Sequence, residues 1–212
     1  MMYTHEWEER EARPTAPVKP VVMPQYEKSL HEVMYRYLQS RGLSERIALD
    51  NGWYPTMDYQ MCARVVIPAS SITNSWPYYQ ARLIVEAHPS VKRYVSPAAP
   101  RGDALAVVFP SKPPKGSIIV EGPMDALAAA GMGYVGVGLM GNTPNSAVLD
   151  HIAQIVKVYG QCYVIPDRDA FIEGAGITAD LWMRGVKCTL KSLTGGKDLA
   201  ELSPSRRERI LS

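Results

Sequence analysis

The stretch that most constrains the fold of this chain is 117–131, which reads SIIVEGPMDALAAAG. Its opening β-branched run is typical of a buried strand. The run ends in an acid, Glu121, followed by a glycine that allows a tight turn and by Pro123, which is preset for the first position of a helix. The helix is expected over 124–130, with Gly131 as its C-terminal cap. A carboxylate therefore lies at the carboxyl end of a strand, where open α/β sheets bind their ligands.

Two further acidic sites follow strand-like runs later in the chain. The run 161–165 indicates another buried strand and leads into Asp167 and Asp169. Side chains two apart on a strand share a face, with Cα atoms about 6.5 Å apart, so these two acids can bind one ion. Asp198 follows a β-like run at 187–193 and a flexible pair of glycines. The sequence thus predicts carboxylates gathered where several strands end.

Strand-like and helix-like runs alternate through this half of the chain, which predicts a parallel α/β unit. The expected strands are 117–120, 134–139, 162–165 and 187–193, and the expected helices are 124–130, 146–159 and 175–184. We therefore expect an α/β fold in which a parallel sheet flanked by helices, over 113–204, is preceded by a smaller α+β subdomain over 26–112. Residues 205–212 are expected to form a short basic tail.

A cluster of carboxylates is costly unless a cation joins it. Two carboxylates about 4 Å apart repel each other by about 4 kcal/mol at an effective dielectric constant of about 20. No His or Cys accompanies these acids, and oxygen ligands favour a hard ion, so Mg²⁺ or Mn²⁺ is the expected cofactor. Such an ion polarises a phosphorus atom and activates an attacking hydroxyl, which fits nucleotidyl transfer, and equally phosphodiester hydrolysis if water attacks.

The first half of the chain carries different signals. Residues 1–25 contain prolines at positions 14, 17, 20 and 24 and are expected to form an extended arm, either a disordered terminus or a segment that docks onto a partner. A helical pattern covers 25–42, and Ser44 is the expected N-cap of a second short helix. The segment 64–110 is expected to form a small β-rich sheet.

Four basic residues come from three separate strands of this expected sheet: Arg64, Arg82, Lys92 and Arg93. If they share one face, they form a positive groove for a phosphate backbone, with Tyr94 as a stacking surface. The alternative is a solvated sheet face whose aromatic residues lie partly in the core.

Composition limits the class of protein. The net charge is +2, so any contact with nucleic acid must come from a local patch. The three cysteines are scattered singly, so neither a zinc ribbon nor a disulfide framework is expected, and a reducing cytoplasm fits. The sequence shows no signal peptide and no apolar stretch long enough to cross a membrane, so we expect a cytoplasmic protein, in the host cytoplasm if it is viral.

The ordered set of strand–Glu–Gly–helix, strand–Asp-x-Asp and Lys-Asp-Leu resembles the Toprim domain shared by bacterial-type primases, topoisomerases, OLD-family nucleases and RecR-type recombination proteins. Upstream, YLQSRGLSERIALDNGWYP at 37–55 resembles the start of the RNA-polymerase region in DnaG-type primases, where a YL-x-x-RGL helix leads into a GY-x-P turn. Within the small sheet the likeness continues through Arg64 and Pro68, Arg82, Arg93 with Tyr94, and Ser96 with Pro97.

The resemblance implies the catalytic core of a DNA primase, a template-directed polymerase that makes short RNA primers on single-stranded DNA from nucleoside triphosphates. It implies that Asp167 and Asp169 bind the metal directly, and that Glu121 is a further ligand or the general acid/base. Asp198 matches the third acidic motif of the family as an outer ligand, but Ala200 stands where the family usually has another acid.

Two roles stay open. Asp125, one helical turn beyond Glu121, is either a metal ligand or a residue that favours the start of the helix. Lys197 either contacts a phosphate or is simply exposed.

The resemblance also implies partners. We expect a replicative helicase and a separate zinc-binding module on other chains, as in a phage or mobile element. Two alternatives remain: a Toprim-type metal-dependent nuclease, and a non-catalytic DNA-binding replication accessory protein.

Overall fold

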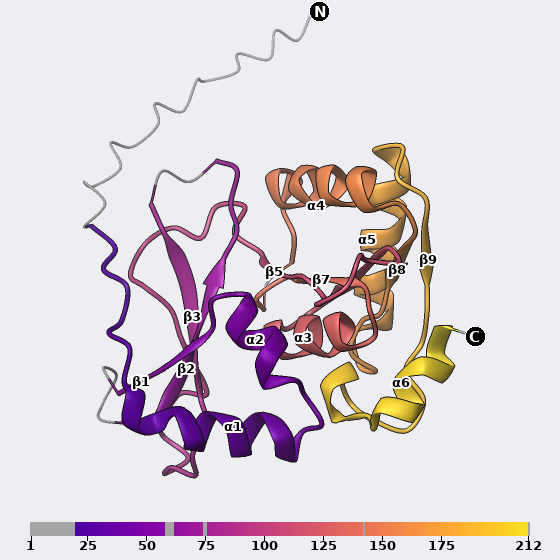
Figure 1. The fold of residues 1–212 in the computed structure, drawn as a ribbon. Coiled ribbons are helices and arrows are strands. Elements are labelled where there is room, and N and C mark those ends of the chain that lie inside the picture. Colours follow the sequence, from indigo (N-terminus) through magenta and orange to yellow (C-terminus); the bar gives the residue numbers. More distant parts are fainter. Residues whose placement is uncertain (1–19, 58–61, 74–75, 142, 212) are drawn as a thin grey trace, which may run out of the picture.

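A computed structural model describes residues 20–57, 62–73, 76–141 and 143–211, which form two sheets with helices packed around them (Figure 1). The helices are η1 Lys28–Leu30, α1 His31–Ser40, α2 Glu45–Asp50, α3 Pro123–Gly131, α4 Ser146–Tyr159, α5 Phe171–Met183, η2 Leu199–Glu201 and α6 Pro204–Leu211. The strands are β1 Tyr54–Thr56, β2 Arg64–Ala69, β3 Tyr78–Leu83, β4 Tyr94–Val95, β5 Ala106–Val108, β6 Ser117–Val120, β7 Val135–Gly138, β8 Cys162–Val164 and β9 Cys188–Leu190.

The amino-terminal sheet is antiparallel, with the strand order β1-β2-β3-β4. Successive residues of β2 face opposite sides, as strand geometry requires. Val65 and Ile67 join the core that α1 and α2 cover, and Val66 lies on the opposite face. Ser44 caps α2 as predicted, because its hydroxyl accepts the Ile47 N–H at 3.3 Å.

The described part of the expected arm, 20–25, contains no helix or strand and follows the outer face of this sheet (Figure 1). The Tyr54 hydroxyl donates to the carbonyl of Pro24 at 2.9 Å, which ties the segment to β1. Residues 1–19 lie outside the described residues, so the arm expected there stays a prediction.

The second sheet has the order β5-β7-β6-β8-β9. Neighbouring strands are parallel except for β5, which runs antiparallel to β7. The predicted α/β unit is therefore confirmed, with one antiparallel edge strand that the sequence pattern had placed in the small amino-terminal sheet. This strand, at 106–108, precedes the boundary expected at residue 112 and yet pairs within the second sheet.

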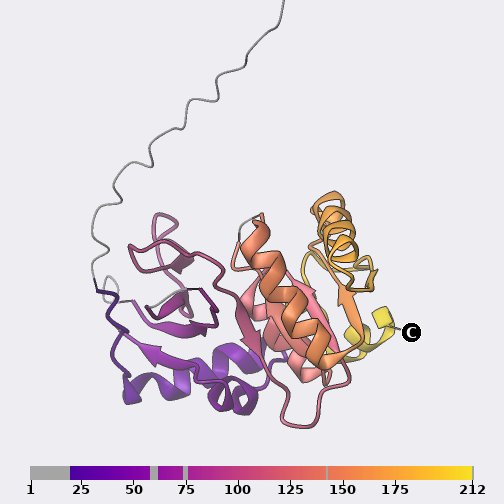
Figure 2. The same cartoon turned by 90° about the horizontal axis from the view of Figure 1, so that it is seen from above.

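Helices cover both faces of the second sheet. Ile118 and Val120 of β6 pack with α3 in the core shared with α1 and α2, whereas Ile119 packs with α4 and α5 on the opposite face. Figures 1 and 2 show α3 and α4 on opposite sides of the strands. The shared core fixes the two sheets relative to each other. None of the helices in the described residues combines the length and apolar character that a membrane span needs.

Some element ends differ from the sequence expectation. Helix α4 has the predicted bounds, but α5 begins at Phe171 rather than at residue 175, because 171–173 form its first turn. Gly174 lies inside this helix, where a Cβ would come within 2.5 Å of the Pro166 ring. Strand β9 spans only 188–190 of the expected 187–193.

Helix α3 lies so close to β7 that only glycine fits at one position. A Cβ on Gly136 would overlap the carbonyl oxygen of Ala126 in α3. Replacing Gly136 with Ala is therefore expected to lower the free energy of unfolding by about 3 kcal/mol, because backbone must move to relieve the overlap. Gly131→Ala, at the end of the same helix and facing open space, is the matched control. Urea unfolding measures both variants, and equal stability of the two would contradict the close approach.

Candidate functional site

The carboxyl ends of β6 and β8 lie beside a groove of about 330 Å³ between the two halves of the molecule. Acidic residues from the second half line one wall: Glu121, Asp125, Asp167, Asp198 and Glu201. Basic residues from the first half line the other: Arg41, Arg82 and Arg93. The groove therefore presents carboxylates opposite guanidinium groups.

Glu121 and Asp167 are brought together by neighbouring parallel strands. Glu121 directly follows β6, and Asp167 lies shortly after β8. The Asp167 N–H donates a hydrogen bond to Glu121 Oε1 at 3.2 Å. The gathering of carboxylates at strand ends, predicted from the sequence, is thus present for these two residues.

Burial, and then repulsion between neighbouring acids, disfavours the charged forms of the carboxyl groups in the acidic wall. Burial, followed by the negative charges of Glu121, Asp198 and Asp169, raises the pKa of Asp167 to about 7. Burial also raises the pKa of Glu121, against the opposing effect of its hydrogen bond from Asp167 N–H. Raised carboxylate pKa values in a groove mark a site where a cation would bind favourably.

Asp125 lies in the first turn of α3 and is buried. Its Oδ1 accepts the Ala200 N–H at 2.8 Å, so it anchors η2 to α3. Burial, and then the charge of Asp198, raises the pKa of Asp125 well above its usual range. Gly122 leaves room for this carboxylate, because a Cβ there would lie 2.8 Å from Asp125 Oδ2. Asp125 thus lines the groove and also positions the third acidic segment.

Asp169 is not where the sequence predicted. Strand β8 ends at Val164, because Pro166 has no N–H with which to continue the ladder, and Asp167 begins a turn closed by the Ala170 N–H. Asp167 and Asp169 therefore do not share a strand face. Asp169 is exposed outside the groove lining, and its Oδ2 lies 3.8 Å from Lys197 Nζ.

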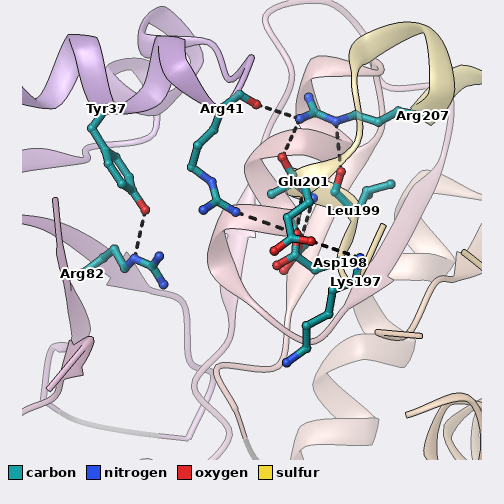
Figure 3. Close-up of polar contacts among 10 residues, drawn as sticks. Tyr37, Arg41, Arg82, Lys197, Asp198, Leu199, Glu201 and Arg207 are labelled. Carbon is teal, nitrogen blue, oxygen red and sulfur yellow. Dashed lines mark hydrogen bonds and ion pairs between the residues drawn. The ribbon is translucent and has the colours of Figure 1, made fainter. Parts of the chain in front are cut away.

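The third acidic segment is built around Asp198, which caps η2. Asp198 Oδ1 accepts the Glu201 N–H at 2.8 Å and lies 3.8 Å from Arg41 Nη2 (Figure 3). The Lys197 N–H donates to Glu201 Oε2 at 3.1 Å. Glu201 thus supplies a carboxylate close to the position where Ala200 departs from the primase pattern.

Metal ligands are not assembled in this conformation. Across 20–57, 62–73, 76–141 and 143–211, no three His, Cys, Asp or Glu side chains converge as they do around a bound ion. The donor chemistry of the acidic wall nevertheless fits a hard divalent ion, since its donors are all carboxylate oxygens. Three of its acids, Glu121, Asp125 and Asp167, have pKa values raised by burial and by the charges of neighbouring acids.

The basic wall is organised by Arg82. Its Nε donates to the Tyr37 hydroxyl at 3.0 Å (Figure 3). Its guanidinium carbon lies 4.8 Å from the centre of the Tyr94 ring. Burial raises the pKa of Tyr94 to about 12, so Tyr94 stays neutral beside the guanidinium. Arg93, which precedes Tyr94, also lines the groove, as the sequence predicted.

Arg41 lines the groove but was absent from the sequence-based set of site residues. It follows the carboxyl end of α1 and reaches across to Asp198. The sequence did contain a pattern that could have identified Arg41, because this residue belongs to the RGL segment that resembles the primase motif. Hydrophobic periodicity indicated only the end of a helix there.

Arg64 and Lys92 do not join the groove. Arg64 is fully buried, and its Nη atoms donate to the carbonyls of Lys92 at 2.9 Å and Ala81 at 3.2 Å. It therefore holds the segment before β4 against β3 and does not reach a phosphate. Lys92 is exposed, but its side chain is not among those that line the groove. The expectation that all four basic residues share one face is wrong for these two. Arg82 pairs with Val65, so strand alternation places Arg64 on the opposite face of the sheet, and Lys92 is not among the residues that line the groove.

Arg207 of α6 is a further residue that the sequence did not indicate. It is buried, and its guanidinium donates at 3.0 Å to the carbonyls of Arg41, Gly42, Leu199 and Ala200 (Figure 3). One side chain thus links the segment that carries Arg41 with the segment that follows Asp198. The contacts with Arg41 and Gly42 join residues more than 150 positions apart, which no local pattern reports.

A larger cavity of about 490 Å³ lies on the other side of Glu121, beside α5. Its lining is mainly apolar, with Glu173 and Asp180 as further acids and no Lys or Arg among the described residues that form it. The smaller groove, with guanidinium groups opposite carboxylates, is therefore the better candidate for a phosphate-bearing ligand.

Comparison with known proteins places the fold. No protein-family model matches the sequence, and no curated protein matches it. The RNA polymerase domain of Mycobacterium tuberculosis primase DnaG is similar in structure, with a TM-score of 0.63, 12% identity, and coverage of 87% of this chain and 78% of that one. The E. coli primase catalytic core gives a TM-score of 0.59 at 18% identity, covering 87% and 76% of the two chains.

A third similar chain comes from a structure of bacteriophage T7 lagging-strand DNA polymerase interacting with the primase domains of two gp4 subunits bound to an RNA/DNA hybrid and dTTP. It gives a TM-score of 0.51 at 16% identity, with coverage of 82% of this chain and 87% of that one. This chain therefore has the fold of a DnaG-type primase catalytic core.

Proposed function

We propose that this protein is the catalytic core of a DNA primase, which synthesises short RNA primers on single-stranded DNA. The observation that carries the proposal is the groove, in which a wall of carboxylates faces Arg41, Arg82 and Arg93 on the fold of primase cores. A nucleoside triphosphate with its divalent ions presents the matching charges, phosphate oxygens for the guanidinium groups and cations for the carboxylates.

Glu121 and Asp167 of the acidic wall would hold Mg²⁺ or Mn²⁺, with Asp125 and Asp198 close by. Asp169, which lies outside the groove lining in this structure, would join them as a further ligand. When bound, such an ion supplies a Lewis acid at the reacting phosphorus and lowers the pKa of the attacking hydroxyl. Asp169 pairs with Lys197 in this structure, so an ion would compete with Lys197 for that carboxylate. Lys197 also lines the groove, so its ammonium group would be available to a phosphate there.

The chain's own residues would bind and orient the substrates. Arg82 is held by Tyr37 and the Tyr94 ring, so its guanidinium N–H donors are oriented before a phosphate binds. Tyr94 lines the groove but packs against the core and carries the Arg82 guanidinium over its ring, so it would act mainly by supporting Arg82. Arg41 bridges toward Asp198 and so places a positive charge beside the acids.

A gel assay tests the proposed activity. The natural chain is incubated with single-stranded DNA, labelled nucleoside triphosphates and Mg²⁺ or Mn²⁺. We expect new short RNA. A shortened template without new RNA would identify a metal-dependent nuclease instead, and DNA binding without either product would identify an accessory protein.

Partners follow from the same proposal. Single-stranded DNA is the template, and we propose that a replicative helicase and a zinc-binding module act with this chain. Adding candidate helicase and zinc-module proteins to the primer assay tests this, with a rise in primer yield as the expected result. An unchanged yield with every candidate would count against these partners.

Arg82 lines the groove and Lys92 lies outside it, so replacing each one shows whether DNA binding depends on the groove or on exposed charge elsewhere. Arg82→Ala is expected to weaken binding of single-stranded DNA and to reduce the salt dependence of the binding constant by about one unit of slope, because one phosphate contact is lost. Lys92→Ala, which removes an exposed charge outside the groove, is expected to leave that slope unchanged. Fluorescence anisotropy across a salt series measures both, and equal slopes for the two variants would contradict the role of the groove.

A further inference from the structure

Two of the three cysteines, far apart in the sequence, meet inside the second sheet. Cys162 of β8 and Cys188 of β9 are direct partners in the parallel pairing of these strands. Both are buried, and their Sγ atoms lie 2.8 Å apart. Partners in register on neighbouring strands project their side chains from the same face of the sheet, here toward the core that α4 and α5 cover.

The separation of the two sulfur atoms distinguishes between the roles that a pair of thiols can play. Two thiolates bound to one zinc ion lie about 3.7 Å apart or more, because each Zn–S bond is about 2.3 Å and the geometry is tetrahedral. At 2.8 Å the pair is too close for a shared metal, and no third ligand converges on it among the described residues. A disulfide bond of about 2.05 Å requires only a small further approach, and neighbouring strands about 4.8 Å apart lie within the Cα range of disulfides.

The two thiols differ in access. Strand β8 is internal, with β6 and β9 on its two sides, whereas β9 is the edge strand of the sheet. Strand β9 is short, and Thr189 next to Cys188 is already exposed. Local opening of this edge therefore exposes Cys188 before Cys162. The thiols also titrate as a pair: hydrogen bonding between them lowers the pKa of Cys188 and raises that of Cys162.

We propose that Cys162 and Cys188 are a redox-active pair that closes reversibly to a disulfide between β8 and β9. With a low-molecular-weight disulfide as oxidant, the Cys188 thiolate attacks one sulfur of the oxidant and releases one thiolate. Cys162 then loses its proton and attacks Cys188 Sγ, which releases the second thiolate. Two protein thiols are oxidised to one disulfide, one oxidant disulfide is reduced to two thiols, and the two protein protons pass to the released thiolates or to solvent.

The cross-link would act on an element that leads to the candidate site. The chain leaving β9 continues to Lys197 and Asp198, and β8 continues to Asp167. In the reduced protein the edge strand is held by its ladder and by the Trp182 Nε1–H, which donates to the Cys188 carbonyl at 2.9 Å. A disulfide would add a covalent constraint to the edge strand.

The test uses the full chain carrying Cys62→Ser, because Cys62 is partly exposed and would react by itself. The folded protein is treated with oxidised glutathione, denatured, alkylated and weighed by mass spectrometry. We expect the oxidised protein to take up no alkyl group, to weigh two hydrogens less than the reduced protein before alkylation, and to carry no glutathione. Dithiothreitol should reverse the change completely. The thermal midpoint should be several degrees higher in the oxidised form than in the reduced form.

Two variants provide the controls. Cys162→Ala is expected to stop at a stable mixed disulfide on Cys188, whereas Cys188→Ala is expected to remain unmodified because its remaining thiol lies on the internal strand. Two free thiols after prolonged treatment of the folded protein would overturn the proposal. A stable glutathione adduct on the parent chain would overturn it as well, because the second thiol would then have failed to reach the first.

Discussion

Replacing Asp167 with Asn is expected to reduce primer synthesis by about 1,000-fold, because metal-assisted charge stabilisation contributes several kcal/mol and each 1.36 kcal/mol is a factor of ten. Asp167 lies between Glu121 and Asp198 on the acidic wall, and its amide analogue keeps the shape of the side chain while removing its charge. The measurement is the initial rate of labelled nucleotide incorporation at saturating Mg²⁺. Glu208→Gln on the exposed side of α6 is the matched control.

The same substitution should leave the fold intact and stabilise it at neutral pH and above. The pKa of Asp167 is raised by burial to about 7 from an ordinary 3.8, so the folded state keeps a proton that the unfolded chain has lost. The contribution of Asp167 to stability is therefore fully present below pH 3.8 and is lost as the pH rises through about 7. Asn does not ionise, so the variant does not lose this stability. After allowance for solvent screening, we expect its free energy of unfolding at pH 8 without divalent ions to exceed that of the natural protein by about 1 kcal/mol.

Thermal unfolding at pH 5 and pH 8, with and without Mg²⁺, tests this explanation. Mg²⁺ should raise the midpoint of the natural chain and have a smaller effect on the Asn variant. An Asn variant that loses activity but is also destabilised at pH 8 would show that Asp167 has a structural role and would contradict the account of uncompensated charge.

Removing the Arg207 side chain is expected to have the largest effect on stability. Arg207→Ala leaves the carbonyls of Arg41, Gly42, Leu199 and Ala200 without their guanidinium partner. Leaving a buried acceptor unsatisfied costs about 1–3 kcal/mol, so we expect a loss of about 3 kcal/mol or more in the free energy of unfolding.

Arg207→Lys should restore only a fraction, because an ammonium group cannot reproduce the planar fork that reaches two chain segments. Activity should fall in both variants, by up to about 100-fold, since Arg41 and the segment after Asp198 lose their common support. Arg206→Ala removes an exposed arginine from the same helix and serves as the control. Urea unfolding and the incorporation rate are measured on all three. A loss in Arg206→Ala equal to that in Arg207→Ala would indicate that the charge of α6 matters rather than the hydrogen bonds.

The sequence predicted those parts of the site whose signals are local. From β6 through Glu121 and Pro123 into α3, consecutive residues carry the signals for a strand, a turn and a helix start. The structure contains all three in this order. Glu121 and Asp167 could be placed near each other because parallel strands bring their carboxyl ends to one edge.

The parts that were missed depend on contacts between distant segments or on small shifts in strand ends. Asp169 leaves the expected face because β8 stops at Val164. Arg64 has the sequence context of a surface basic residue, but the pairing of β2 with β3 places it on the opposite face of the sheet from Arg82, where it is buried. Arg207 lies in a segment whose composition indicates only a basic tail, and its role appears when α6 packs against the loop after α1.

The most direct test of the central claim is extension of an RNA strand annealed to a longer DNA template, which bypasses any start-site requirement. Four templates differ only in the first unpaired base, and each is offered the four nucleoside triphosphates singly with Mg²⁺ or Mn²⁺. We predict that the natural chain adds only the nucleotide complementary to that base, and that Asp167→Asn adds none at a comparable rate. Bound duplex with no extension under either ion, or addition of the same nucleotide whatever the template base, would contradict a template-directed polymerase.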